Sequence, residues 1–250
     1  MSRVFVAPII GQSAASGAQV IDGSLKFDSS SDNHLTRTLS SNGSTAATFS
    51  FWFKKGNQGA GNDPVGYESF VDAYVSSATY TRLYLNGSQL AMVHRVSDNQ
   101  NNLRTNAVFR DIGWYHVVGT SDSNGHPAVY VNGVQITSYT SSDFSNTQSS
   151  NAATTSGATV EIATQNGRTD RNFDGLISNF YFIDGQALGP ENFGFTDGLT
   201  NTWKPKKYTG TFGTNGFWLP MDVSAPIGQD KSGNGNDWTP RNFGGSVALD

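Results

Sequence analysis

Carboxylates are the first side chains to consider, because a suitably placed pair of them can break a glycosidic bond. One carboxyl donates a proton while the other attacks the sugar or activates water, and a retaining enzyme holds the two about 5 to 5.5 Å apart. The chain has only three glutamates, Glu68, Glu161 and Glu191, and they lie far apart in the sequence. Two aspartates from different strands could in principle take the place of a catalytic glutamate pair. We therefore expect no catalytic residues and no enzyme.

A second oxygen-rich pattern lies at residues 230–236, where the spacing follows the first half of a calcium-binding loop. Its candidate metal ligands are Asp230, Ser232, Asn234 and Asn236. Position 12 of the loop is Arg241 instead of the bidentate glutamate, so the loop alone would bind a cation weakly unless other carboxylates converge on it. We favour a turn in which Asp230 accepts backbone N–H groups and the glycines adopt positive φ. No cofactor is required, and calcium is the one metal that the pattern allows.

Aromatic side chains could stack against a sugar ring, beside Asn or Asp groups that bind its hydroxyls. The chain has 5 Trp, 9 Tyr and 16 Phe, and most of them must be buried in a core. The candidates for an exposed carbohydrate-binding surface are Trp203, Tyr208, Tyr139 and Phe144. His116 lies in an aromatic strand and is expected to be a core residue, since the four histidines lack the His-x-x-x-His spacing of a helical zinc site.

Composition excludes several classes of protein. The formal net charge is −4 and the basic residues are scattered, which argues against a nucleic-acid-binding surface. There is no cysteine, hence no disulfide scaffold and no thiolate chemistry. No apolar run approaches the ~20 residues that span a bilayer, so membrane insertion is not expected. Few helix formers and many short runs of β-branched and aromatic residues exclude an all-α fold.

Short strands must position the candidate residues. Phe49, Phe51 and Phe53 alternate with polar or amphipathic neighbours, so their face of the strand should be buried. Residues 114–120 form a second such strand, and 176–183, apolar on both faces, should be a central one. Asn-Gly occurs in Leu83–Leu90 and again in Val129–Ile136, and each pair predicts a hairpin with a type I′ turn.

The remaining segments predict an N-terminal arm, a body and two surface stretches. Residues 1–23 carry a short apolar run followed by small residues and are expected to be an attachment or oligomer-contact arm, while residues 24–250 form the folded domain. Residues 140–158 read as a long polar loop, and Trp203–Tyr208 as an extended surface tie instead of a strand. The alternative for the arm is that it folds back along its own sandwich.

Three motifs in order resemble the laminin-G and pentraxin branch of the concanavalin A-like lectin/glucanase superfamily: Trp114–Val118, Ala128–Val134 and Phe173–Phe182. Two further blocks, Trp203–Gly210 and Asp230–Pro240, resemble lectin-like virion proteins of bacteriophages, mostly marine ones. The resemblance covers roughly residues 24–243 and implies an all-β, antiparallel two-sheet jelly-roll sandwich. Residues 217–221 should return to the sheets beside Ser24–Phe27.

The resemblance also implies a function. It indicates a non-enzymatic bacteriophage virion structural protein, a fibre, tail or capsid-surface component, with a lectin-like module for host-surface glycans. Its partners would be other virion proteins bound through the arm and further copies of the chain in a homo-oligomer. It would be located in the virion, assembled in the host cytoplasm. A free carbohydrate-binding lectin is the alternative, and a glycoside hydrolase is the third.

Overall fold

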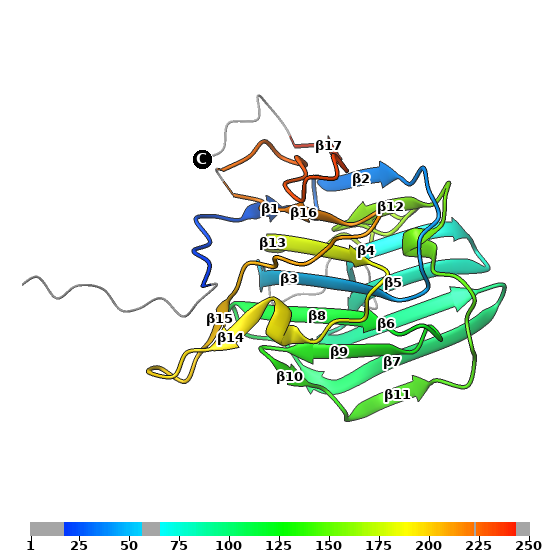
Figure 1. The fold of residues 1–250 in the computed structure, drawn as a ribbon, viewed down its shortest axis with the longest axis horizontal. Coiled ribbons are helices and arrows are strands. Elements are labelled where there is room, and N and C mark those ends of the chain that lie inside the picture. Colours follow the sequence, from blue (N-terminus) through cyan, green and yellow to red (C-terminus); the bar gives the residue numbers. More distant parts are fainter. Residues whose placement is uncertain (1–17, 57–65, 223, 244–250) are drawn as a thin grey trace, which may run out of the picture.

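The structure is a computed structural model that describes residues 18–56, 66–222 and 224–243, and its main feature is a pair of antiparallel sheets packed face to face (Figure 1). The predicted all-β, two-sheet jelly-roll sandwich is confirmed. In the described residues the only helical segments are two 3₁₀ turns, Ala152–Thr154 and Pro190–Asn192. None of the described residues form a helix long and apolar enough to cross a bilayer.

The seven-stranded sheet has the order β1-β13-β3-β8-β9-β10, with β16 also paired to β13. β1 and β16 lie end to end along the same edge of β13, because β1 pairs with residues 175–177 and β16 with residues 180–182. The predicted return of the C-terminal segment beside residues 24–27 is therefore confirmed. The strands are β1 (Leu25–Phe27), β3 (Ala47–Lys55), β8 (Tyr115–Ser121), β9 (Pro127–Val131), β10 (Val134–Gln135), β13 (Gly175–Asp184) and β16 (Phe217–Leu219).

The eight-stranded sheet has the order β11-β7-β6-β5-β4-β12-β2-β17. Its centre consists of long strands joined by short turns, and its ends are short strands from distant parts of the chain. The strands are β2 (His34–Thr38), β4 (Tyr67–Ser76), β5 (Thr79–Asn86), β6 (Gln89–Val96), β7 (Asn99–Val108), β11 (Tyr139–Asp143), β12 (Thr159–Ile162) and β17 (Thr239–Arg241).

Phenylalanine rings fill the space between the sheets. The predicted inward face of β3 is confirmed, since Phe49, Phe51 and Phe53 are at most 1% exposed. Phe51 stacks on Phe180 of β13 with ring centroids 4.8 Å apart, and it contacts Phe70 of β4 at 5.0 Å. One strand thus joins both sheets through its side chains.

The two Asn-Gly hairpins have different turns. Between β9 and β10, Asn132 (φ 47°) and Gly133 (φ 83°) are the two loop residues, as a type I′ turn requires. Between β5 and β6, Asn86 still pairs with Gln89, so the loop is Gly87-Ser88 and only Gly87 has positive φ (64°). The prediction of a type I′ turn is wrong there, because the ladder extends one residue further and places the glycine first, as in a type II′ turn.

Two predicted loops contain strands. The first part of residues 140–158 belongs to β11, which pairs with β7, and Ala152 and Ala153 farther along are buried. Trp203 starts β15 (Trp203–Pro205), which pairs with β14 (Gly194–Thr196) as a separate two-stranded ribbon. Pro205 is tolerated because it ends an edge strand. Of the predicted arm, residues 1–17 lie outside the described residues, while Ala18 forms a bridge with Lys206 next to β15.

The phenylalanine packing generates a stability prediction. Replacing Phe51 by alanine should lower the free energy of unfolding by about 3 to 5 kcal/mol, since the ring is fully enclosed and the cavity cannot collapse onto rigid strands. Denaturant titration measures this loss. Phe144→Ala is the control, because its ring is 38% exposed and its removal should cost well under half as much. Equal losses in the two variants would contradict the packing argument.

Candidate functional site

A groove follows β6 across the outer face of the eight-stranded sheet. Val93 points outward at its floor, where it pairs with Arg82 of β5 and Asn102 of β7. Ala91 is the next outward residue of β6, and like Val93 it is much smaller than the residues paired with it, Tyr84 and Arg104. Longer side chains on β5 and β7 rise on both sides of these two, which leaves a hollow of about 250 Å³.

Tyrosine and arginine side chains form one wall of this groove. The guanidinium of Arg82 lies over the ring of Tyr80, with 3.8 Å from Cζ to the ring centroid. Tyr67 and Tyr84 stack with centroids 5.4 Å apart, and Arg171 covers the other end of this group, 4.5 Å from the Tyr67 centroid. Burial raises the pKa of Tyr84 to about 12, so its hydroxyl stays neutral. Aromatic faces and N–H donors thus line the same wall.

Amide side chains face this wall from β7. Gln100 and Asn102 occupy alternate positions of the strand, and the same alternation brings Arg104 to the groove. Asn86 closes the groove at the end of β5. Amides both donate and accept hydrogen bonds, so this side can bind neutral hydroxyl groups.

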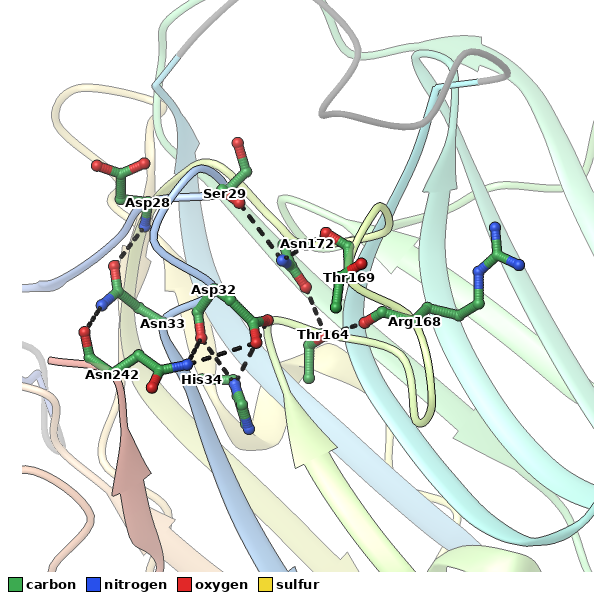
Figure 2. A network of polar contacts seen from close by, with 10 residues as sticks. All are labelled: Asp28, Ser29, Asp32, Asn33, His34, Thr164, Arg168, Thr169, Asn172 and Asn242. Atoms are coloured by element: carbon green, nitrogen blue, oxygen red, sulfur yellow. Dashed lines mark hydrogen bonds and ion pairs between the residues drawn. The ribbon is translucent and has the colours of Figure 1, made fainter.

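The loop that carries Gln165 and Arg171 is held in place by a polar network at its base (Figure 2). Asn172 donates to the carbonyl oxygens of Ser29 (3.4 Å) and Thr169 (3.2 Å) and accepts from the hydroxyl of Thr164. These contacts join the loop to the segment that follows β1. The rim of the groove is therefore fixed by the folded body.

The same base binds a C-terminal residue. The Asp28 amide donates to Asn33 at 3.1 Å, and the side-chain amide of Asn33 donates to the carbonyl of Asn242. Asn242 in turn donates to the carbonyl of Asp32 at 3.0 Å. Figure 2 shows these residues beside the Asn172 contacts. Segments from the start, middle and end of the domain therefore meet at this end of the sandwich.

The acidic residues near the groove do not form an open pair. Glu161 and Asp72 are direct cross-strand neighbours on the outer face, and burial raises the pKa of both. However, both carboxylate oxygens of Asp72 are engaged, one by Nε of Arg82 at 2.7 Å and the other by the backbone N–H of Asn166 at 2.9 Å. Asp72 is also fully buried. This arrangement favours a structural carboxylate over a nucleophile.

A bulge on β4 separates Asp72 from a second acidic residue of the same strand, Glu68. Glu68 precedes Asp72 by four residues on β4, a spacing that would place both on one face of a regular strand. The register shifts between Ser69 and Val71, so Glu68 points into the sandwich and Asp72 out of it. Glu68 is paired with Lys55, with 2.8 Å between Oε1 and Nζ and both side chains almost fully enclosed. The two carboxylates cannot act on one substrate.

The predicted aromatic residues lie in three different places. Tyr208 is 7% exposed, packed with Tyr181 and Phe193 under the segment that covers the seven-stranded sheet, so burial removes it as a stacking surface. Tyr139 and Phe144 contact each other edge to face, 6.0 Å apart, near the edge strand β11. Neither lines the groove.

Trp203 lies in a pocket on the opposite sheet. The pocket has a volume of about 410 Å³ and is lined by Trp52, Trp114 and Trp203 together with Ile21 and Pro205. The indole N–H of Trp203 donates to Nδ1 of His116 at 2.9 Å. The indole also fits closely over Gly133, where an added Cβ would lie 2.5 Å from it. Trp203 is thus held rigidly, three residues before Lys206, which forms a bridge with Ala18.

His116 is a core residue, as predicted. It is 1% exposed, and its Nε2 is 2.9 Å from the hydroxyl of Ser50 while Nδ1 accepts from Trp203. Burial lowers its pKa to about 3. The ring is therefore neutral and acts as a hydrogen-bond bridge between β3 and the β14–β15 ribbon.

The loop at residues 230–236 is built as a turn. The Asp230 carboxylate accepts from the backbone N–H groups of Trp218 (2.9 Å), Ser232 (2.8 Å) and Asn236 (2.8 Å) and from the Ser232 hydroxyl (2.8 Å). The side-chain amides of Asn234 and Asn236 donate to the backbone carbonyl of Gly216. Hydrogen-bond donors, instead of further oxygen ligands, thus surround the Asp230 carboxylate. Among the described residues, no cluster of three acidic or histidine side chains is present. The donor set does not fit a calcium ion.

The groove was not among the sites predicted from the sequence, although a pattern in the sequence marks it. Tyr80, Arg82, Tyr84 and Asn86 recur at every second position of one strand, so they share one face of it. Gln100, Asn102 and Arg104 repeat the pattern on β7. Only the register between the strands shows that these two rows face each other across small residues.

Comparisons with known proteins agree with the fold. The sequence profile of the concanavalin A-like lectin/glucanases superfamily matches residues 28–192. A candidate carbohydrate-binding protein from Bacteroides ovatus is similar in structure, with a TM-score of 0.55 and 14% identity, over 91% of this chain and 61% of that one. Domains LG4-5 of the mouse laminin α1 chain have a TM-score of 0.50 and 11% identity, over 75% of this chain and 50% of that one. No curated protein matches the sequence.

A pH prediction follows from the buried histidine. The folded pKa of His116 is far below that of a free histidine, about 6.5. Its ring signals in an NMR titration should therefore not move between pH 8 and pH 5. Because the unfolded chain takes up this proton first, the histidine should reduce stability as pH falls from about 6.5 toward 3. A midpoint near 6 for the His116 signal would contradict its enclosed position.

Proposed function

Because the chain belongs to the concanavalin A-like lectin/glucanase superfamily, we propose that it is a non-enzymatic glycan-binding module whose ligand lies in the groove along β6. The observation that carries this proposal is the composition of the groove. Sugars present apolar ring faces and neutral hydroxyl groups, and the groove offers tyrosine rings on β5 and amides on β7. The named function of the similar Bacteroides protein agrees with this assignment.

The position of the carboxylates supports binding without hydrolysis. A glycosidase needs one carboxyl that donates a proton and a second that is free to react. Asp72 is buried and held by Arg82 and Asn166, and Glu68 lies on the inner face of the sheet. We therefore expect no release of reducing sugar from bound glycans. Measurable turnover abolished by Asp72→Asn would favour a glycoside hydrolase instead.

We further propose that the module is a structural protein of a bacteriophage virion, a fibre, tail or capsid-surface component that contacts glycans of the host surface. The blocks Trp203–Gly210 and Asp230–Pro240 support this origin through their resemblance to lectin-like virion proteins. Residues 18 and 19 lie on the other side of the sandwich from the groove, since Gln19 donates to the Pro205 carbonyl of β15 and its side chain is bonded to Asn179 and Tyr181 of β13. The arm can thus bind other virion proteins or further copies while the groove stays open.

A free carbohydrate-binding lectin is the second candidate function. The same groove would serve it, and the two differ only in whether the chain is attached to a particle. Detection of the protein in purified particles distinguishes them.

The role of the groove is tested by removing an amide from its β7 side. Asn102→Ala should weaken glycan binding by about tenfold, because one lost hydrogen bond to a ligand costs about 1 to 2 kcal/mol. Binding is measured by calorimetry with ligands first selected on a glycan array. Asn99→Ala is the matched control, since Asn99 is exposed on the same strand and does not line the groove. Equal effects of the two changes would place the ligand elsewhere.

The attachment proposal is tested by deleting residues 2–17. The deletion keeps Gln19, whose side chain is bonded to Asn179 and Tyr181, so the thermal melting temperature should change little. Incorporation into particles or oligomers should be lost, as measured by co-purification and light scattering. Unchanged assembly would refute the role of the arm, whereas an unfolded domain would indicate that the segment folds back on its own sandwich.

A further inference from the structure

Arg104 differs from the other arginines of the groove. Arg82 is paired with Asp72, and Arg171 donates to Gln165 at 3.0 Å and lies over Tyr67. The Arg104 side chain makes no hydrogen bond or ion pair with any of the described residues, and its Nε is shielded from solvent without a partner. A shielded N–H donor without a partner is costly, and proteins ordinarily pair such groups.

The surroundings of Arg104 leave room for a partner to reach it from the groove. On either side in the sheet it faces a small residue, Ala91 of β6 and Ser141 of β11. No carboxylate lines the groove in the part of the chain that the structure describes, whereas three arginines do. Arg82 is paired with Asp72, so Arg104 is a positive charge that the groove can offer to a ligand.

We propose that the groove selects acidic glycans, and that Arg104 binds the carboxylate or sulfate group of an acidic sugar. This inference rests on the proposed glycan-binding function and adds the class of ligand. A planar guanidinium can bind either anion with two parallel N–H donors, and binding would supply the partner that Nε lacks. The tyrosine wall and the amides of β7 then hold the neutral part of the same sugar chain.

The experiment compares three oligosaccharides with one backbone: a uronic-acid form, its carboxyl-reduced neutral form, and a sulfated form of the neutral chain. Calorimetry on the full chain should give at least tenfold tighter binding of one or both acidic forms than of the neutral form. The two acidic arms show whether a carboxylate or a sulfate is preferred. Affinity for the acidic form should fall as salt is raised, since the contact is between charges.

Variants then assign the preference to Arg104. Arg104→Gln should bring the affinities for the acidic and neutral forms to within about twofold. Arg104→Lys should restore part of the difference, because lysine keeps the positive charge but lacks the two parallel N–H donors of the guanidinium. Arg168→Gln is the matched control, since it removes the same charge from an arginine outside the groove that is paired with Asp170. The melting temperature of Arg104→Gln should not fall, because no pairing contact within the described protein is lost.

The outcomes separate the two proposals. Equal affinity of the native chain for acidic and neutral forms would overturn the acidic-glycan inference and leave the glycan-binding function standing. A preference that survives in Arg104→Gln, or that is lost equally in Arg168→Gln, would overturn the role of Arg104. Failure of all three glycans to bind, together with an empty glycan array, would overturn the proposed function itself.

Discussion

Packing of phenylalanine rings between the two sheets is the constraint on which the rest of the structure depends. Phe51 contacts Phe180 within its own sheet and Phe70 in the opposite one, so the sheets are held in one relative position. Buried side chains pack nearly as densely as in crystals, and a shift of either sheet would break many contacts at once. With both inner faces committed to this core, only the outer faces are available for other roles.

The two outer faces are used differently. Over the seven-stranded sheet, the segment after β13 packs Phe193 and Tyr208 onto Val118 and Tyr181, which forms a second apolar cluster. On the eight-stranded sheet, the outward side chains of β5 and β7 that line the groove are tyrosines, arginines and amides, and among the described residues no apolar cluster of this kind packs on them. The covered face thus stabilises the domain, and the face with the groove is the one for which we propose a ligand.

One irregularity on β4 determines the chemistry of the open face. The register shift between Ser69 and Val71 turns Glu68 inward to Lys55 and leaves Asp72 outward beside Arg82. A regular strand would have placed two carboxylates on one face. As built, Asp72 pairs with Arg82, and no acidic side chain among the described residues lines the groove beside Arg104. The bulge therefore keeps the two carboxylates of β4 on opposite faces of the sheet.

The sequence by itself determined the fold class, the inward face of β3, the buried state of His116 and the turn at Asp230, because each rests on local alternation, turn chemistry or composition. It did not determine the groove, because Tyr84 and Arg104 are twenty positions apart and meet across β6 only through the register of three strands. It also misplaced Tyr208, since an aromatic residue in a polar segment looks exposed until that segment is seen to cover a sheet. Local patterns are set by neighbours along the chain, whereas a binding surface on a sheet is set by neighbours across strands, and only the tertiary structure decides which those are.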